Sequence, residues 1–154
     1  MVMAFRALRL LIPALWLGLI IGISLIEAPL KFQAPGITIP LGLGIGRLVF
    51  GVMNIVEAVF ALVLLVAMVF ARPPRTEWLL GLAVTAVLAL KALIIRPVMQ
   101  QTTDAVIEGT SAGGSNMHLF YIAADGILIL LLIGLTIATS RTLLRASAPQ
   151  TLVK

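Results

Sequence analysis

Residues 41–71 read LGLGIGRLVFGVMNIVEAVFALVLLVAMVFA and form the longest apolar stretch of the chain. A run of about 18 or more apolar residues with few charges is typical of a membrane-spanning helix, because the hydrocarbon core is about 30 Å thick. As a helix, this segment of about 31 residues spans roughly 46 Å. It therefore predicts a membrane span that is tilted or extends beyond the core, and that carries Glu57 within it.

Three further stretches are apolar and long enough to cross a membrane, namely 8–30, 78–98 and 119–139. The composition agrees, since the 154 residues are 61% hydrophobic and 11% charged, whereas soluble domains are about 25% charged. We therefore predict an all-α integral membrane four-helix bundle, formed by residues 1–146 as one domain and followed by a disordered tail at 147–154. The second and third helices are expected to be long, and the third to continue past Pro97.

Basic residues predict the orientation of an up-down-up-down bundle. Those that flank helix ends on one side are Arg6, Arg9, Arg72, Arg75, Arg141, Arg145 and Lys154. The positive-inside rule then places both termini and the 72–75 turn in the cytoplasm. The predicted location is the cell membrane, as a multi-pass protein, with a bacterial inner membrane favoured. The net charge of +5 does not favour nucleic-acid binding, because no aromatic interleaving or binding motif accompanies it.

Glu57, Lys91 and Asp125 each lie inside a different apolar stretch. A charged side chain at membrane depth costs at least about 2.5–3.5 kcal/mol, so such residues usually face the bundle interior and pair with one another. Counting along each helix from its predicted outer end places Glu57 and Lys91 about 10 Å deep and Asp125 about 9 Å deep. We therefore predict that the three side chains meet in the outer leaflet.

Two of these helices carry further polar residues on the same face as the buried charge. On the last helix, His118 and Tyr121 precede Asp125 by seven and four residues, so the three share one face. On the second helix, Asn54 lies three residues before Glu57. We predict an outward-opening polar cup. Its candidate ligand-binding or buried polar residues are Glu57, Lys91, Asp125, Asn54, Tyr121, His118 and Arg47, and its rim residues are Glu27, Lys31 and Arg96.

Below this cup the bundle is expected to be apolar, because residues 58–70, 79–90 and 126–137 include no charged side chain. A conducting pore needs a wettable path along its whole length, so the pattern argues against a simple channel. The favoured hypothesis is that the cup binds, or helps to transport, a small polar or amphipathic molecule. One alternative is an accessory or assembly subunit of a larger membrane complex, with a structural ion-pair cluster. Another is an intramembrane enzyme that uses Glu57 or Asp125 as acid or base.

The chain has no cysteine, and His118 is its one histidine. This excludes thiol redox chemistry, paired haem ligation and a histidine-rich zinc site. No catalytic residue, metal or cofactor is therefore predicted, and an enzyme is the less favoured interpretation. The expected partners are the lipid bilayer and either a second copy of the chain or a larger membrane complex. Gly18 and Gly22 form a small-xxx-small pair that permits close helix contact, within one bundle or between copies.

Segments 14–18 (ALWLG), 28–32 (APLKF) and 46–50 (GRLVF), together with His118 at the start of the last helix, carry a resemblance to a known family. They resemble the small four-helix bacterial membrane proteins related to the eukaryotic cisplatin-resistance-associated transmembrane proteins. Glu57 and Lys91 lie outside that family's pattern. The resemblance implies a four-helix bundle and a role in handling a small solute or xenobiotic, and it implies no catalytic residue.

Overall fold

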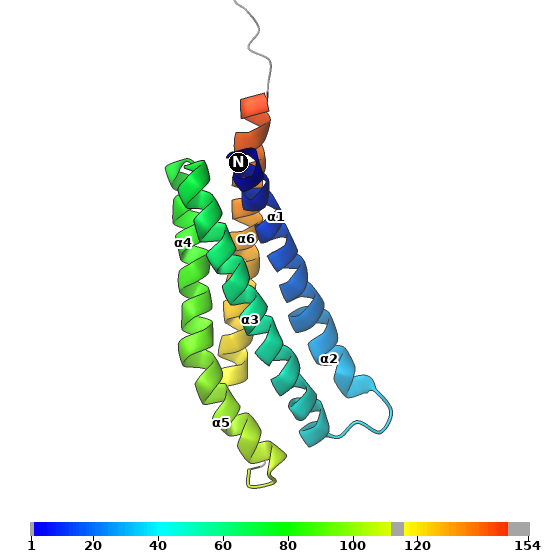
Figure 1. Ribbon diagram of the computed structural model, residues 1–154. Helices are drawn as coiled ribbons and strands as arrows, with labels where there is room; N and C mark the ends of the chain where they lie inside the picture. Colours follow the sequence, from blue (N-terminus) through cyan, green and yellow to red (C-terminus); the bar gives the residue numbers. More distant parts are fainter. Residues whose placement is uncertain (1, 112–115, 148–154) are drawn as a thin grey trace, which may run out of the picture.

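The computed structural model describes residues 2–111 and 116–147. Within this part of the chain every regular element is a helix and no strand is present (Figure 1). The helices that are long and apolar enough to cross a membrane are Val2–Gln33, Ile39–Ala71, Arg75–Ile107 and His118–Ala146. The predicted all-α fold with four long apolar helices is therefore confirmed, and it fits a multi-pass integral membrane protein. The predicted disordered tail lies, from residue 148 onward, outside the described residues.

The first and third of these long helices are composite. The elements in chain order are α1 (Val2–Ile20), the π-helical turn η1 (Ile21–Glu27), α2 (Ala28–Leu30), the 3-10 turn η2 (Lys31–Gln33), α3 (Ile39–Ala71), α4 (Arg75–Leu90), the π-helical turn η3 (Lys91–Ile95), α5 (Arg96–Ile107) and α6 (Met117–Ser147). The third long helix thus continues past Pro97, as the sequence predicts. All four extend beyond the predicted apolar stretches, since polar residues at the ends also form helix.

The two ends of the bundle hold different connections. Figure 1 shows the start of α1, the α3–α4 connection and the end of α6 at one end, which we call the N-terminal end. The α2–α3 connection, the end of α5 and the start of α6 lie toward the other, which we call the loop end. Each long helix therefore runs antiparallel to the next one in the chain.

The ends of α3 follow from local sequence. At its start, Thr38 Oγ1 accepts a hydrogen bond from the Leu41 amide at 3.4 Å, and Pro40 occupies the first turn, where a missing amide does no harm. At its end, Arg72 adopts the left-handed conformation with φ of 49°, and Pro73 follows it. Such a residue closes a helix, and proline cannot continue it. The short α3–α4 hairpin results.

Both π-helical turns immediately precede a proline. η1 ends two residues before Pro29 and η3 ends two residues before Pro97, and each closes with an amide bonded to the carbonyl five residues back. A proline inside a helix lacks an amide and presses on the carbonyl four residues before it. The wider turn accommodates this without ending the helix. Ser24 and Lys91 lie in these two turns, and π-turns of this kind are frequent at functional sites.

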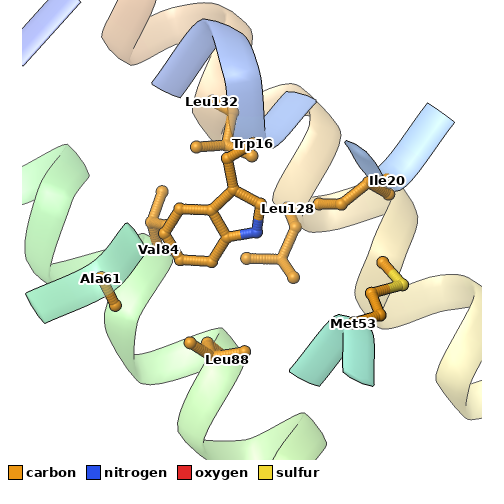
Figure 2. Packing of buried hydrophobic residues seen from close by; sticks show 8 residues of the cluster. All are labelled: Trp16, Ile20, Met53, Ala61, Val84, Leu88, Leu128 and Leu132. Carbon is orange, nitrogen blue, oxygen red and sulfur yellow. The ribbon is translucent and has the colours of Figure 1, made fainter. Parts of the chain in front are cut away.

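The middle of the bundle is a dry apolar core around Trp16, whose side chain is fully buried. Figure 2 shows its indole among side chains from all four long helices. The cluster consists of Trp16, Ile20, Met53, Ala61, Val84, Leu88, Leu128 and Leu132. A second cluster of Ile12, Leu64, Met68 and Leu135 continues it. The charge-free segments predicted below the cup therefore pack as an apolar plug.

Gly81 on α4 is expected to be intolerant of a side chain. A Cβ atom there would lie 2.7 Å from Met68 Sδ and 2.9 Å from Met68 Cε, and Met68 is 1% exposed. Gly81→Ala should therefore lower the free energy of unfolding by about 1–3 kcal/mol through overpacking. Gly134→Ala is the matched control, because its Cβ would lie 3.9 Å from Leu80 Cδ2, an ordinary contact. Thermal unfolding in detergent compares them, and equal melting temperatures would contradict this account.

Candidate functional site

Lys91 lies between two carboxylates inside the bundle. Its Nζ is 2.8 Å from both Glu57 Oε1 and Glu57 Oε2, and 2.7 Å from Asp125 Oδ1. The three side chains come from η3, α3 and α6, and each is at most 1% exposed. The structure thus brings together the three charges that the depth counts place in one layer, and we call them the Lys91 cluster.

Two further donors bond to these carboxylates. Trp16 Nε1 donates to Glu57 Oε1 at 3.0 Å, and Ser24 Oγ donates to Asp125 Oδ2 at 2.6 Å. A buried ion pair is favoured where the remaining lone pairs also find donors; Asp125 meets this requirement, whereas Glu57 Oε2 has only its ion contact with Lys91 Nζ at 2.8 Å. Both donors come from the first long helix, and neither was assigned to the site from the sequence.

Tyr121 and Asn54 belong to the same buried region. Lys91 Nζ lies 5.0 Å from the centroid of the Tyr121 ring, and Phe50 packs edge-on against that ring at 5.4 Å. The Asn54 amide nitrogen donates to the Phe50 carbonyl at 2.9 Å. Asn54 also lies beside the Tyr121 hydroxyl, but neither this hydroxyl nor Asn54 Oδ1 has a hydrogen-bond partner of good geometry.

A cavity of about 600 Å³ opens over this cluster toward the loop end of the bundle. Its lining is mostly apolar. The predicted site residues that line it are Asp125, Tyr121, His118, Arg47, Lys31 and Arg96. The predicted site residues outside the lining are Glu57, Lys91, Asn54 and Glu27. The predicted cup is therefore two regions, an open cavity and the buried Lys91 cluster beneath it. Asp125 is the member of the cluster that lines the cavity.

The mouth of the cavity is surrounded by basic side chains. Arg47 Nη1 pairs with Asp104 Oδ1 at 2.8 Å on the exposed surface, and Lys31 Nζ lies 3.4 Å from Glu27 Oε2. Arg96 has no ion-pair partner in the described part of the chain, and its guanidinium lies against α3 near Gly51. Arg47 thus belongs to the exposed mouth, because the extended α5 brings Asp104 to it.

A second buried ion pair lies near the N-terminal end and was not predicted. Arg9 Nη2 is 3.0 Å from Glu77 Oε2, and Thr139 Oγ1 donates to the same oxygen at 2.9 Å. Arg9 is 3% exposed and Glu77 is 1% exposed. Arg9 is therefore not one of the basic residues flanking the bundle, which corrects the sequence-based interpretation. A signal was present, since Arg9 lies inside the apolar stretch 8–30 and could have been counted as a buried charge.

Gly18 and Gly22 lie on the outside of the first long helix. A Cβ atom at either position would have no neighbour within 4 Å. The sequence leaves two roles open for this pair, close packing within one bundle or between copies. The structure does not show the two glycines closely packed within the bundle. Their surface is open to lipid or to another helix.

Comparisons of the chain with protein-family models, with curated proteins and with solved structures found no match. The function is therefore inferred from the geometry of the site. Asp125 is the one acid that lines the cavity among the described residues, and both its oxygens already accept hydrogen bonds. Glu57 does not line the cavity. Among the described residues, therefore, no carboxylate with a free oxygen lines the cavity.

Proposed function

We propose that the protein is an integral membrane protein that binds, or helps to transport, a small polar or amphipathic molecule in the cavity beside Asp125. The single observation that supports this most is the cavity of about 600 Å³. Sites for small molecules are typically concavities of about 300–1,000 Å³ that are mainly apolar, with a few convergent polar groups. The lining combines both features, since apolar side chains surround Asp125, Tyr121 and Arg96.

Binding is favoured over conduction by what lies beyond the cavity. The Lys91 cluster closes its inner end, and the Trp16 core follows without a charged group. The next ionisable groups toward the N-terminal end are Arg9 and Glu77, which are paired with each other. A continuous wettable path, as a channel requires, would have to cross the buried apolar side chains. Transport in this proposal therefore involves a change of conformation or a partner.

A cavity-filling substitution tests the proposed binding. Ala28 lines the cavity, so Ala28→Phe should displace a bound molecule by occupying its volume. Ala58→Phe is the matched control, because Ala58 is exposed on α3 and lies outside the cavity lining. Native mass spectrometry of the purified chain should show a co-purified molecule in the wild type and in Ala58→Phe but not in Ala28→Phe. Absence of any bound molecule, or equal occupancy in all three, would count against binding.

We further propose that the N-terminal end faces the cytoplasm and that the cavity opens on the other side of a bacterial inner membrane. The described basic residues at the N-terminal end, with Arg9 removed from the count, are Arg6, Arg72, Arg75, Arg141 and Arg145. The positive-inside rule favours this orientation. At the loop end, Lys31 and Arg47 are each paired with an acid.

Cysteine labelling tests this orientation cleanly, because the chain has no cysteine of its own. Ala34, in the α2–α3 connection, and Thr76, in the first turn of α4, are exposed at opposite ends of the bundle. A membrane-impermeant maleimide added to intact cells should label Ala34→Cys and should label Thr76→Cys only after permeabilisation. The reverse pattern would invert the proposed topology, and labelling of both in intact cells would indicate dual insertion.

Two proposals from the sequence concern relatives and partners. The resemblance to the small four-helix membrane proteins related to cisplatin-resistance-associated proteins supports a role in handling a small solute, which agrees with a binding cavity. Association of two copies through Gly18 and Gly22 is supported by the open surface at both residues and by the close approach that small residues allow. Docking to a larger membrane complex is the alternative use of that surface.

A further inference from the structure

At the cavity a cationic hydrogen-bond donor is left without an acid among the described residues, whereas the acid that lines it is already satisfied. Asp125 accepts from Lys91 through Oδ1 and from Ser24 through Oδ2. Arg96 carries five N–H donors, and no described acid pairs with it. The buried Tyr121 hydroxyl lies beside the Asn54 amide, so Arg96 is the donor with free capacity. The free capacity of the site is therefore to donate to an acceptor.

The balance of charge around the cavity points the same way. Of the lysine and arginine residues in its lining, Lys31 and Arg47 are offset by Glu27 and Asp104. Arg96 remains as the cation without an opposing acid in the described part of the chain. A planar guanidinium recognises carboxylate and phosphate through two parallel hydrogen bonds. An anionic group placed beside Arg96 would supply the missing partner.

The rest of the lining suits a hydrocarbon body and not a second charged group. Apolar side chains from five elements contribute to it, namely Leu25, Phe32, Leu43, Phe50, Met99 and Ile122. Phe32 also packs directly on Gly42, where a Cβ atom would overlap the ring. This contact holds the end of the first long helix against α3 and shapes an apolar wall. A ligand that matches the cavity is thus charged at one end only.

We propose that the cavity recognises an oxyanion, a phosphate or a carboxylate, carried on an amphipathic molecule, with Arg96 binding the oxyanion. This inference rests on the proposed binding function and specifies its ligand class. Arg96 is the first residue of α5, directly after the π-turn that places Lys91, so one short segment carries both the cation that binds the ligand and the cation that is buried. A soluble oxyanion shares the same recognition chemistry, and the experiment separates the two sources.

Binding of three probes with the same twelve-carbon chain tests the inference on the full chain in maltoside micelles. Dodecyl phosphate should bind about tenfold or more tightly than dodecanol, because a charge-assisted pair with Arg96 is added. Dodecyltrimethylammonium should bind no more tightly than dodecanol. Occupancy by native mass spectrometry across a concentration series gives the ratios. Inorganic phosphate is then added as a competitor. If it fails to displace dodecyl phosphate, the ligand is an amphipathic molecule. If it displaces dodecyl phosphate fully, the ligand is a soluble oxyanion at the same site.

Variants of Arg96 assign the effect to this residue. Arg96→Gln should remove the preference for dodecyl phosphate over dodecanol, and Arg96→Lys should restore part of it. Arg141→Gln is the control, because it removes the same charge from an exposed position on α6 at the other end of the bundle. If Arg96→Gln does not fold, the probe series on the wild-type chain still decides the question.

The outcomes separate this inference from the function on which it rests. Equal or tighter binding of dodecanol or dodecyltrimethylammonium, lost in Ala28→Phe, would overturn the oxyanion inference and leave the binding function standing. A preference for dodecyl phosphate that persists in Arg96→Gln would likewise overturn the assignment to Arg96. If no probe binds and Ala28→Phe behaves as the wild type, both proposals fail.

Discussion

Lys91→Met should lower the free energy of unfolding by about 3–5 kcal/mol, because it leaves charged groups buried without their partner. The Lys91 ammonium contacts both Glu57 and Asp125, and none of the three side chains is more than 2% exposed. Methionine fills a similar volume but offers neither carboxylate a donor. Unfolding in a titration of denaturing detergent, followed by circular dichroism, measures the loss.

Lys31→Met is the matched control for this prediction. The Lys31 partner, Glu27, has a side chain that is 32% exposed, and their separation of 3.4 Å is longer than the contacts of Lys91. An ion pair that reaches solvent contributes about 0–1 kcal/mol. The control variant should therefore unfold close to the wild type. Similar losses in both variants would mean that the Lys91 cluster does not depend on its ammonium.

Glu57→Gln should have a much smaller effect than Lys91→Met. Lys91 keeps its contact with Asp125 at 2.7 Å, so it is not left unpaired, and the glutamine oxygen can still accept from Trp16. A small loss in this variant therefore does not by itself indicate a ligand site. The ligand question is decided at the cavity, by Ala28→Phe and Arg96→Gln, and not within the cluster.

The sequence predicts that the buried charges share one layer because helix geometry is nearly invariant. Each residue advances a helix by 1.5 Å, so counting from the helix ends was enough to place Glu57, Lys91 and Asp125 in one layer. Where a helix is apolar on all sides, its sequence does not show which face turns toward the bundle interior. Ser24 and Trp16 were missed for this reason, since each faces the cluster only through the packing of the first long helix.

The π-turns and helix ends limited the prediction in a second way. η1 and η3 shift the helical register, and the residues after each turn point in directions that a regular 3.6-residue period does not give. Pro29 and Pro97 were a usable signal, since each follows a π-turn by two residues. The sequence predicts Arg47 in the cup because it does not locate the partner of this residue. That partner, Asp104, lies on a polar extension of the third long helix, which hydrophobicity alone does not position.

Arg9→Met should be the second most destabilising change, with a loss of about 3–5 kcal/mol from the uncompensated Glu77 carboxylate. Glu77 would then retain only the Thr139 hydroxyl at 2.9 Å. Arg6→Met is the control, because Arg6 is exposed three residues earlier on the same helix. The same detergent titration should show the control unfolding near the wild type, and equal losses would contradict a buried pair.

Replacing both partners separates the pair's net contribution from the penalty of breaking it. Arg9→Met combined with Glu77→Leu should recover most of the loss of the single change, because apolar side chains often replace a buried ion pair at little cost. Failure to recover would show that the pair itself stabilises the bundle. Ligand occupancy adds a second readout: Arg9 lies at the end opposite the cavity, so its folded variants should bind as the wild type does. The two buried ion-pair clusters would then differ in role, with only the Lys91 cluster adjoining the site that binds.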